Sequence, residues 1–160
     1  MTRRANPSGP TRQKPTRRSR YPKLWTLQDP EPLGLVFQTF EDLSTLRQRC
    51  VRNVAGAKED ERLFGHLMQN VDQSGLQRWS RVSERVMTSW SLLDDTVRTN
   101  QFDPAQCQEA YRQMWGVRAV WLRLEPQRGS LALIDRVIDH LRQLFICYAQ
   151  AQGQRRRLQP

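Results

Sequence analysis

Residues 76–97, LQRWSRVSERVMTSWSLLDDTV, hold the longest helical pattern in this sequence. Large apolar residues recur there at spacings of three and four, at Leu76, Trp79, Val82, Val86, Trp90, Leu93 and Val97. On a helix, this spacing places the seven side chains in one continuous stripe. The stretch therefore predicts a long amphipathic helix that buries one face against other helices.

Shorter patterns of the same period precede it. The first is expected to stop at Gly56 and consists of Phe37, Phe40, Leu43, Leu46, Cys50 and Val54. A second helix is expected to close near Ser74-Gly75, and its apolar residues are Leu63, Phe64, Leu67, Met68 and Val71. Both patterns predict amphipathic helices.

Two more helices are expected after the long one. The residues DPAQ, 103–106, place a capping aspartate before a proline that suits the first helical turn. The core face that follows is Ala110, Met114, Val117, Trp121 and Leu124, ended by Pro126. The last pattern fades at Gly153 and consists of Leu131, Ile134, Val137, Ile138, Leu141, Leu144, Phe145 and Tyr148.

No segment alternates apolar and polar residues at period two, so strands are not expected. Connections of two to six residues favour antiparallel neighbours. The sequence therefore predicts an all-α, up-and-down bundle of four to five helices over residues 35–153. A disordered, Arg- and Pro-rich arm and strap is expected over 1–34, and a short basic tail over 154–160.

The excess positive charge of the chain lies on these two ends. The net charge is +10, yet residues 24–154 hold 15 basic and 16 acidic side chains. The arm carries eight basic residues and no acidic one: Arg3, Arg4, Arg12, Lys14, Arg17, Arg18, Arg20 and Lys23. The tail adds Arg155, Arg156 and Arg157. Basic arms of this kind bind polyanions, and arginine grips phosphate with two parallel hydrogen bonds.

Arginine outnumbers lysine 23 to 3. Selection for the guanidinium group is one explanation, and a GC-rich genome or overlapping reading frames is the other.

The end of the arm has large anchors in an extended, proline-punctuated context, namely Tyr21, Leu24, Trp25 and Leu27. One interpretation is a strap that lies across the helical body. The other is a linear motif that enters the groove of a partner protein.

The long helix also carries a basic stripe, because Arg78, Arg81 and Arg85 recur at spacings of three and four. This stripe is either a solvated helix face or an extension of the phosphate-binding arms.

Motifs of catalysis and metal binding are not found. The two histidines lie far from cysteines at ligand spacing, and no Gly-rich phosphate loop or nucleophile elbow occurs. The acid pair Asp94-Asp95 consists of neighbours that point in different directions on a helix. We therefore expect no catalytic residue, no metal ligand and no cofactor, and hence a protein that is not an enzyme.

Cys50, Cys107 and Cys147 are odd in number and fall beside apolar helix positions, which indicates buried thiols in a reducing compartment. No apolar run reaches the roughly 18 residues of a membrane span, and no hydrophobic signal segment follows the N-terminus. The expected location is intracellular and cytoplasmic, without membrane contact, or nuclear in a eukaryotic host.

A disordered basic leader before a neutral helical body resembles the organisation of the accessory C proteins of paramyxoviruses. It is similar, more loosely, to the small helical subunits of RNA-guided effector complexes. The resemblance covers the layout of the whole chain, is carried by no motif, and transfers no residue roles.

Two functions fit the sequence. In the first, the arginine-rich arms bind nucleic acid, with RNA ahead of DNA, and the bundle serves self-association or assembly with a protein partner. In the second, the bundle is a regulatory adaptor for another protein, as in a small viral accessory protein. The basic leader is then a localisation signal.

Overall fold

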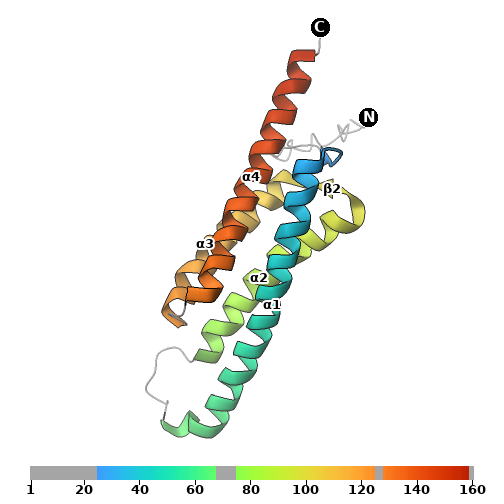
Figure 1. Ribbon diagram of the computed structural model, residues 1–160. Coiled ribbons are helices and arrows are strands. Elements are labelled where there is room, and N and C mark those ends of the chain that lie inside the picture. Colours follow the sequence, from blue (N-terminus) through green and yellow to red (C-terminus); the bar gives the residue numbers. More distant parts are fainter. Residues whose placement is uncertain (1–24, 68–74, 125–127, 159–160) are drawn as a thin grey trace, which may run out of the picture.

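The computed structural model describes residues 25–67, 75–124 and 128–158; of these, the side chains of residues 128 and 155–158 are not described. Four helices make up the body, and Figure 1 shows them packed along one another. They are α1 (Pro30–Phe64), α2 (Gly75–Thr99), α3 (Pro104–Leu124) and α4 (Arg128–Leu158). Each helix runs antiparallel to the two it packs against, and α4 closes the ring onto α1. The all-α, up-and-down bundle expected from the sequence is confirmed.

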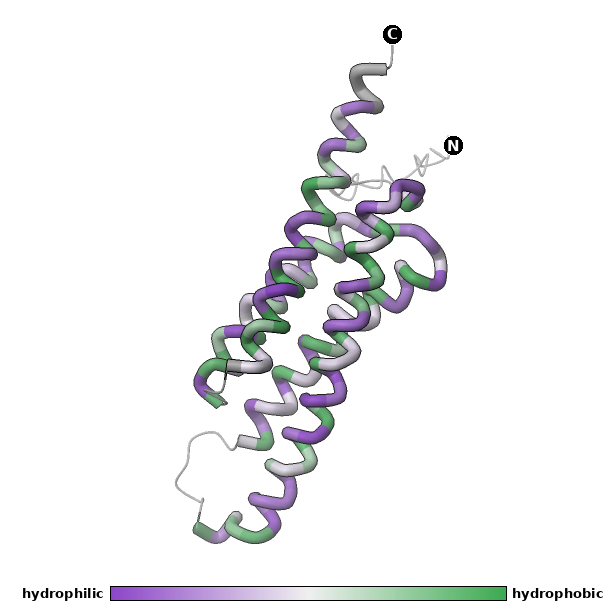
Figure 2. Tube along the Cα trace, in the orientation of Figure 1, coloured by the Kyte–Doolittle hydropathy of each residue, from purple (hydrophilic) through white to green (hydrophobic). Residues whose placement is uncertain are grey.

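The core lies where the four apolar faces meet. Figure 2 shows apolar and polar residues alternating along every helix, as a bundle requires. Residues that are fully enclosed come from all four helices, and they include Leu43, Leu46, Val86, Leu93, Met114, Trp121, Ile134 and Leu144. The core face expected for α3 is buried from Ala110 to Trp121, while Leu124 is partly exposed.

The buried face of α1 differs from the expected one. Its buried positions are Pro32, Val36, Thr39, Asp42, Leu43, Leu46 and Cys50, whereas Phe37 is 53% exposed. Thr39 can enter the core because its Oγ1 donates a hydrogen bond of 2.6 Å to the carbonyl oxygen of Leu35. A hydroxyl that is hydrogen-bonded within its own helix can be buried at little cost in free energy. The expected stripe counted only apolar residues, and it therefore missed Thr39.

Helix α1 is longer than expected at both ends. It begins at Pro30, within the segment expected to be a strap, because proline suits the first turn of a helix. It then passes through Gly56 without a break. A glycine inside a helix costs only about 1 kcal/mol, which packing against α2 offsets.

The expected second helix is therefore not a separate element in the described residues. Leu63 and Phe64 end α1, and the 3₁₀ turn η1 (Gly65–Leu67) follows. Met68 and Val71 lie outside the described residues.

Helix α4 also extends past its expected end at Gly153, as far as Leu158. The backbone of Arg155, Arg156 and Arg157 is thus helical, where a basic tail was expected.

Two very short strands, β1 (Trp25–Thr26) and β2 (Gln101–Phe102), pair antiparallel, with Trp25 opposite Phe102. The sequence did not indicate them, because two residues are too few to show a period. Asn100 supports the pairing from the left-handed region (φ 56°). Its backbone oxygen accepts a hydrogen bond from Leu27 N at 3.1 Å, and its Nδ2 donates to Leu27 O at 2.8 Å.

This pairing decides between the two interpretations of the anchors before α1. Trp25 and Leu27 are 5% and 2% exposed, and the Trp25 ring packs edge-on against Phe102 and Tyr148 at 6.0 and 5.9 Å. The strap interpretation is correct for residues 25–27. The assignment of Trp25 and Leu27 to a partner-binding motif was wrong, since the core of their own chain covers them. Tyr21 and Leu24 lie outside the described residues.

None of the helices in the described ranges combines the length and the apolar character that crossing a membrane requires.

Candidate nucleic-acid interface

Four arginines line a groove between α2 and α3. Arg78, Arg81 and Arg85 come from one face of α2, and Arg123 comes from the last turn of α3. The apolar side chains of Val82, Val120 and Leu124 complete the lining. The groove measures about 170 Å³, smaller than the roughly 300 Å³ of the smallest usual ligand pockets. It suits a small anionic group, such as a phosphate, better than an enclosed molecule.

The antiparallel register of the two helices brings these arginines together. The chain reverses between Thr99 and Pro104, so the first turns of α2 lie beside the last turns of α3. Arg78 thereby comes close to Arg123, and Arg85 comes close to Gly116. The sequence identified the three arginines of α2 as a stripe but missed Arg123 and Gly116. The pairing of the two helices across their turn is the signal that would have found them.

Gly116 makes room for one of the guanidinium groups. A Cβ at this position would lie 3.3 Å from Arg85 Cζ and closer still to Arg85 Nη1. Contacts below 3.4 Å are crowded, so Arg85 can lie across α3 only because residue 116 has no side chain. Arg85 is thereby placed at the boundary of the two helices.

Among the residues that the structure describes, no acidic side chain lines this groove. Within the described part of the chain, none of its four arginines has an ion pair or a side-chain hydrogen bond. Six other arginines do have carboxylate partners, namely Arg62, Arg98, Arg112, Arg118, Arg136 and Arg142. The groove is thus a place where positive charge gathers without neutralisation, as an anion site requires.

For the other expected nucleic-acid contacts, the structure describes only the backbone of Arg155, Arg156 and Arg157. Arg3, Arg4, Arg12, Lys14, Arg17, Arg18, Arg20 and Lys23 lie outside the described residues. The backbone of Arg155, Arg156 and Arg157 ends α4 at the top of Figure 1, whereas α2 begins near the other end of the bundle. The arginine groove and the end of α4 therefore lie at opposite ends of the bundle.

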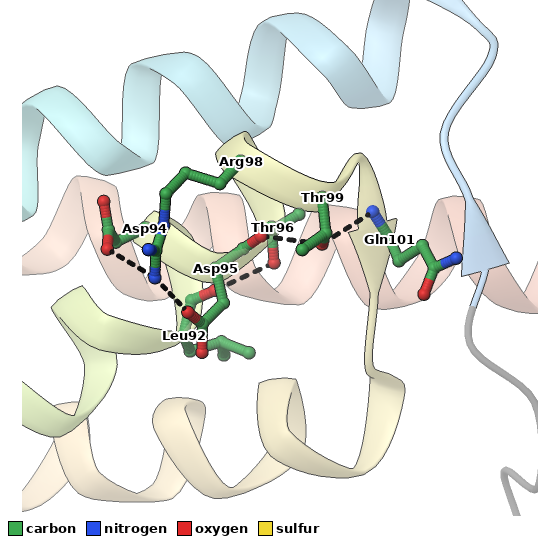
Figure 3. Close-up of polar contacts among 7 residues, drawn as sticks. All are labelled: Leu92, Asp94, Asp95, Thr96, Arg98, Thr99 and Gln101. Carbon is green, nitrogen blue, oxygen red and sulfur yellow. Dashed lines mark hydrogen bonds and ion pairs between the residues drawn. The ribbon is translucent and has the colours of Figure 1, made fainter.

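The acid pair of α2 has a structural role. Arg98 Nη2 binds the Asp94 and Asp95 carboxylates at 3.1 and 2.6 Å, as Figure 3 shows. Thr99 Oγ1 donates to the backbone oxygen of Asp95 at 2.7 Å and accepts from Gln101 N at 3.3 Å. These contacts tie the end of α2 to β2.

The thiols and the histidines do not form a site in the described ranges, where no three His, Cys, Asp or Glu side chains come together around a candidate metal position. Cys50 and Cys107 are buried, and burial raises the pKa of each thiol to about 12. Both are therefore protonated near neutral pH.

Comparisons with protein-family models, with curated proteins and with solved structures found no match for this chain.

Proposed function

We propose that this protein is a non-enzymatic nucleic-acid-binding protein, with RNA preferred over DNA, that acts as an accessory or structural component. The observation that carries the proposal is the groove of Arg78, Arg81, Arg85 and Arg123, whose described lining contains no carboxylate. Like charges three and four residues apart on a helix cost about 0.2–0.5 kcal/mol per pair. A bound phosphate offsets this repulsion and accepts the parallel hydrogen bonds that guanidinium groups donate.

The N-terminal arm supplies the second part of the proposed interface. Its eight basic residues and its lack of acidic ones suit it to contact successive phosphates without sequence preference. The groove then adds contacts on the folded body.

A triple variant tests the proposal. Arg78→Gln, Arg81→Gln and Arg123→Gln together remove three charges from the groove. The matched control replaces Arg62, Arg98 and Arg142 by glutamine, which removes three exposed charges that are paired with carboxylates. Affinity for RNA and for DNA is measured across a salt titration. Each lost phosphate contact lowers the slope of log K against log salt by about 0.7 for a single strand and 0.9 for a duplex.

The groove variant should therefore bind less tightly, with a slope smaller by about 2 to 3, while the control stays close to the wild-type chain. If the two variants lose the same affinity and slope, the groove has no special role. If the wild-type chain binds neither RNA nor DNA, the proposed function is wrong.

A second candidate function is that of a protein adaptor. The observation that favours it is at the end of α1, where Leu63, Phe64 and Leu67 are 47%, 50% and 73% exposed. A pull-down from lysate with and without nuclease separates the two functions. Partners held through nucleic acid are lost on nuclease treatment, whereas partners of an adaptor remain.

A further inference from the structure

Trp115 lies exposed on α3, directly before the glycine that Arg85 covers. Its side chain is 48% exposed. The Tyr111 ring supports it from the side, with the ring centroids 6.3 Å apart and the planes at 87°. The Arg118 guanidinium lies 5.9 Å from the Trp115 ring and also binds Asp135 at 2.6 Å. The indole is thus held in place by its neighbours and still has surface open to solvent.

The exposed indole directly precedes Gly116, the residue of α3 that Arg85 covers. Trp115 and Arg123 are eight residues apart on α3, which is about 12 Å along the helix axis and about 80° around it. Arg85, which lines the groove with Arg123, lies over Gly116, the residue next to Trp115. Among the described residues, seven other large apolar side chains are exposed, so exposure alone does not distinguish Trp115. What distinguishes it is its position next to Gly116, over which the groove residue Arg85 lies.

We propose that the ligand of this surface is single-stranded nucleic acid, and that one of its bases stacks on Trp115 while neighbouring phosphates lie among Arg78, Arg81, Arg85 and Arg123. This inference rests on the proposed function and makes it more specific. In a duplex, the faces of the bases are covered by their neighbours, and only the backbone is open to contact from this surface. In a single strand, unstacked bases offer their faces to aromatic side chains, and the backbone follows a positively charged groove.

Charge complementarity favours this ligand over a protein partner. The arginines require several negative charges at short, regular intervals, which a phosphodiester backbone supplies. An aromatic side chain stacks on a flat π system. The bases supply one for every phosphate of the backbone. Base–aromatic contacts of this kind are tolerant of sequence, because every base has a π face.

The test compares three variants of the full chain. Trp115→Ala removes the stacking surface, Trp115→Phe keeps an aromatic ring, and Leu122→Ala is the control, because Leu122 is 47% exposed on the same helix. The probes are a labelled single-stranded oligouridylate and an RNA duplex of the same length, followed by fluorescence anisotropy at fixed salt. Circular dichroism checks that each variant is folded.

Trp115→Ala should weaken binding of the single strand about 5- to 150-fold and leave duplex binding unchanged. Its salt slope should equal that of the wild-type chain, because stacking releases no counterions. Trp115→Phe should restore most of the affinity, and Leu122→Ala should have no effect.

Three results would overturn the inference: unchanged single-strand binding by Trp115→Ala, an equal loss for strand and duplex, or an equal loss by Leu122→Ala. In each of these cases the proposed function stands if the arginine variants still lower the salt slope. It falls together with the inference only if neither probe binds the wild-type chain.

Discussion

At the scale of single residues, the aromatic side chains divide into those that hold the core and those that cover its edge. Trp121 is fully buried, and its ring packs edge-on against Trp79 at 4.9 Å. Trp90 is only partly buried, although the sequence assigned it to the apolar stripe of its helix. Its Nε1 donates a 3.0 Å hydrogen bond to Ser44 Oγ, and the Arg47 guanidinium lies 4.1 Å from the ring centre. Trp90 therefore covers the outer edge of the contact between α1 and α2.

This division predicts an order of stabilities. Trp121→Ala should lower the free energy of unfolding by about 3–5 kcal/mol, as expected for a fully buried large aromatic residue. Trp90→Ala should cost less than about 3 kcal/mol, because part of its surface is already in water in the native state. Chemical denaturation of the two variants measures both values. An equal or larger loss for Trp90→Ala would contradict the observed burial.

The thiols give a prediction for pH and reactivity. Burial raises the pKa of Cys50 and of Cys107 to about 12, above the 9.0 of an exposed thiol. The folded state therefore keeps both protons more firmly than the unfolded state. The stabilisation is complete below about pH 9 and is lost as the pH rises towards 12. A thiol reagent at pH 8 should label Cys147, which is partly exposed, and reach the other two only after unfolding. Rapid labelling of all three in the native protein would be the contrary result.

Small hydroxyl side chains explain why sequence reasoning shifted some core positions. Thr39, Ser89 and Thr96 are buried, and Phe37, Trp90 and Val97 take the flanks beside them. Thr96 Oγ1 donates to Leu92 O at 2.9 Å, so burial leaves its hydroxyl paired. Threonine and serine count as polar in a hydropathy pattern. The pattern therefore assigns the buried face to the larger apolar residues beside them.

At the scale of the helices, the sequence predicted α2 and α3 well. The continuous stripe of residues 76–97 required a long helix, and α2 covers it with one or two further residues at each end. The start of α3 was encoded locally, since Asp103 Oδ1 accepts hydrogen bonds from Ala105 N and Gln106 N at 3.0 and 3.3 Å. Gly56 was misjudged as an end of α1 because propensity is weaker than packing.

The helical pattern of a sequence does not predict how neighbouring helices are aligned. It therefore does not predict the arginine groove, which this alignment forms. Arg123 and Gly116 belong to the groove only because α3 packs antiparallel on α2. A periodic pattern gives the face of one helix, but it does not give the neighbour that meets that face.

Two glycines inside helices provide a matched test of how the groove is built. A Cβ at Gly56 would meet nothing within 4 Å, whereas a Cβ at Gly116 would collide with Arg85. Gly56→Ala should raise the free energy of unfolding by about 0.5–1 kcal/mol and leave nucleic-acid binding unchanged. Gly116→Ala should keep the fold, because a flexible side chain can move, and should weaken binding by displacing Arg85. Equal affinities for the two variants would show that the position of Arg85 does not matter.

At the scale of the whole molecule, the basic residues of the groove and those at the end of α4 lie in separate regions of the bundle. The groove lies towards one end of the bundle, while β1 and the last turns of α4 lie at the other end. With 31 residues, α4 spans about 45 Å. A polyanion that contacts both ends must follow the length of the bundle.

Deletion of residues 1–23 tests the share of the arm in the proposed function. The truncated chain keeps Trp25 and Leu27, so its helical circular dichroism should be nearly unchanged. Most of the affinity for nucleic acid should be lost, because the arm holds eight of the 26 basic residues and no acidic one. For the full chain, about 6 to 10 phosphate contacts imply a roughly 10³- to 10⁵-fold loss of affinity between 50 and 200 mM salt. A truncated chain that binds as tightly as the full chain would remove the arm from the interface.

The most direct measurement is to map where nucleic acid touches the folded body. A single-stranded RNA that carries photoreactive uridines is cross-linked to the full chain, and the attached peptides are identified by mass spectrometry. Within residues 25–158, we predict cross-links to the α2 segment 78–85 and to the α3 segment 112–123, with Trp115 as the main site. Competition with unlabelled strand should abolish them. Cross-links in the body that avoid both segments and fall elsewhere, such as on the exposed end of α1, would contradict the account.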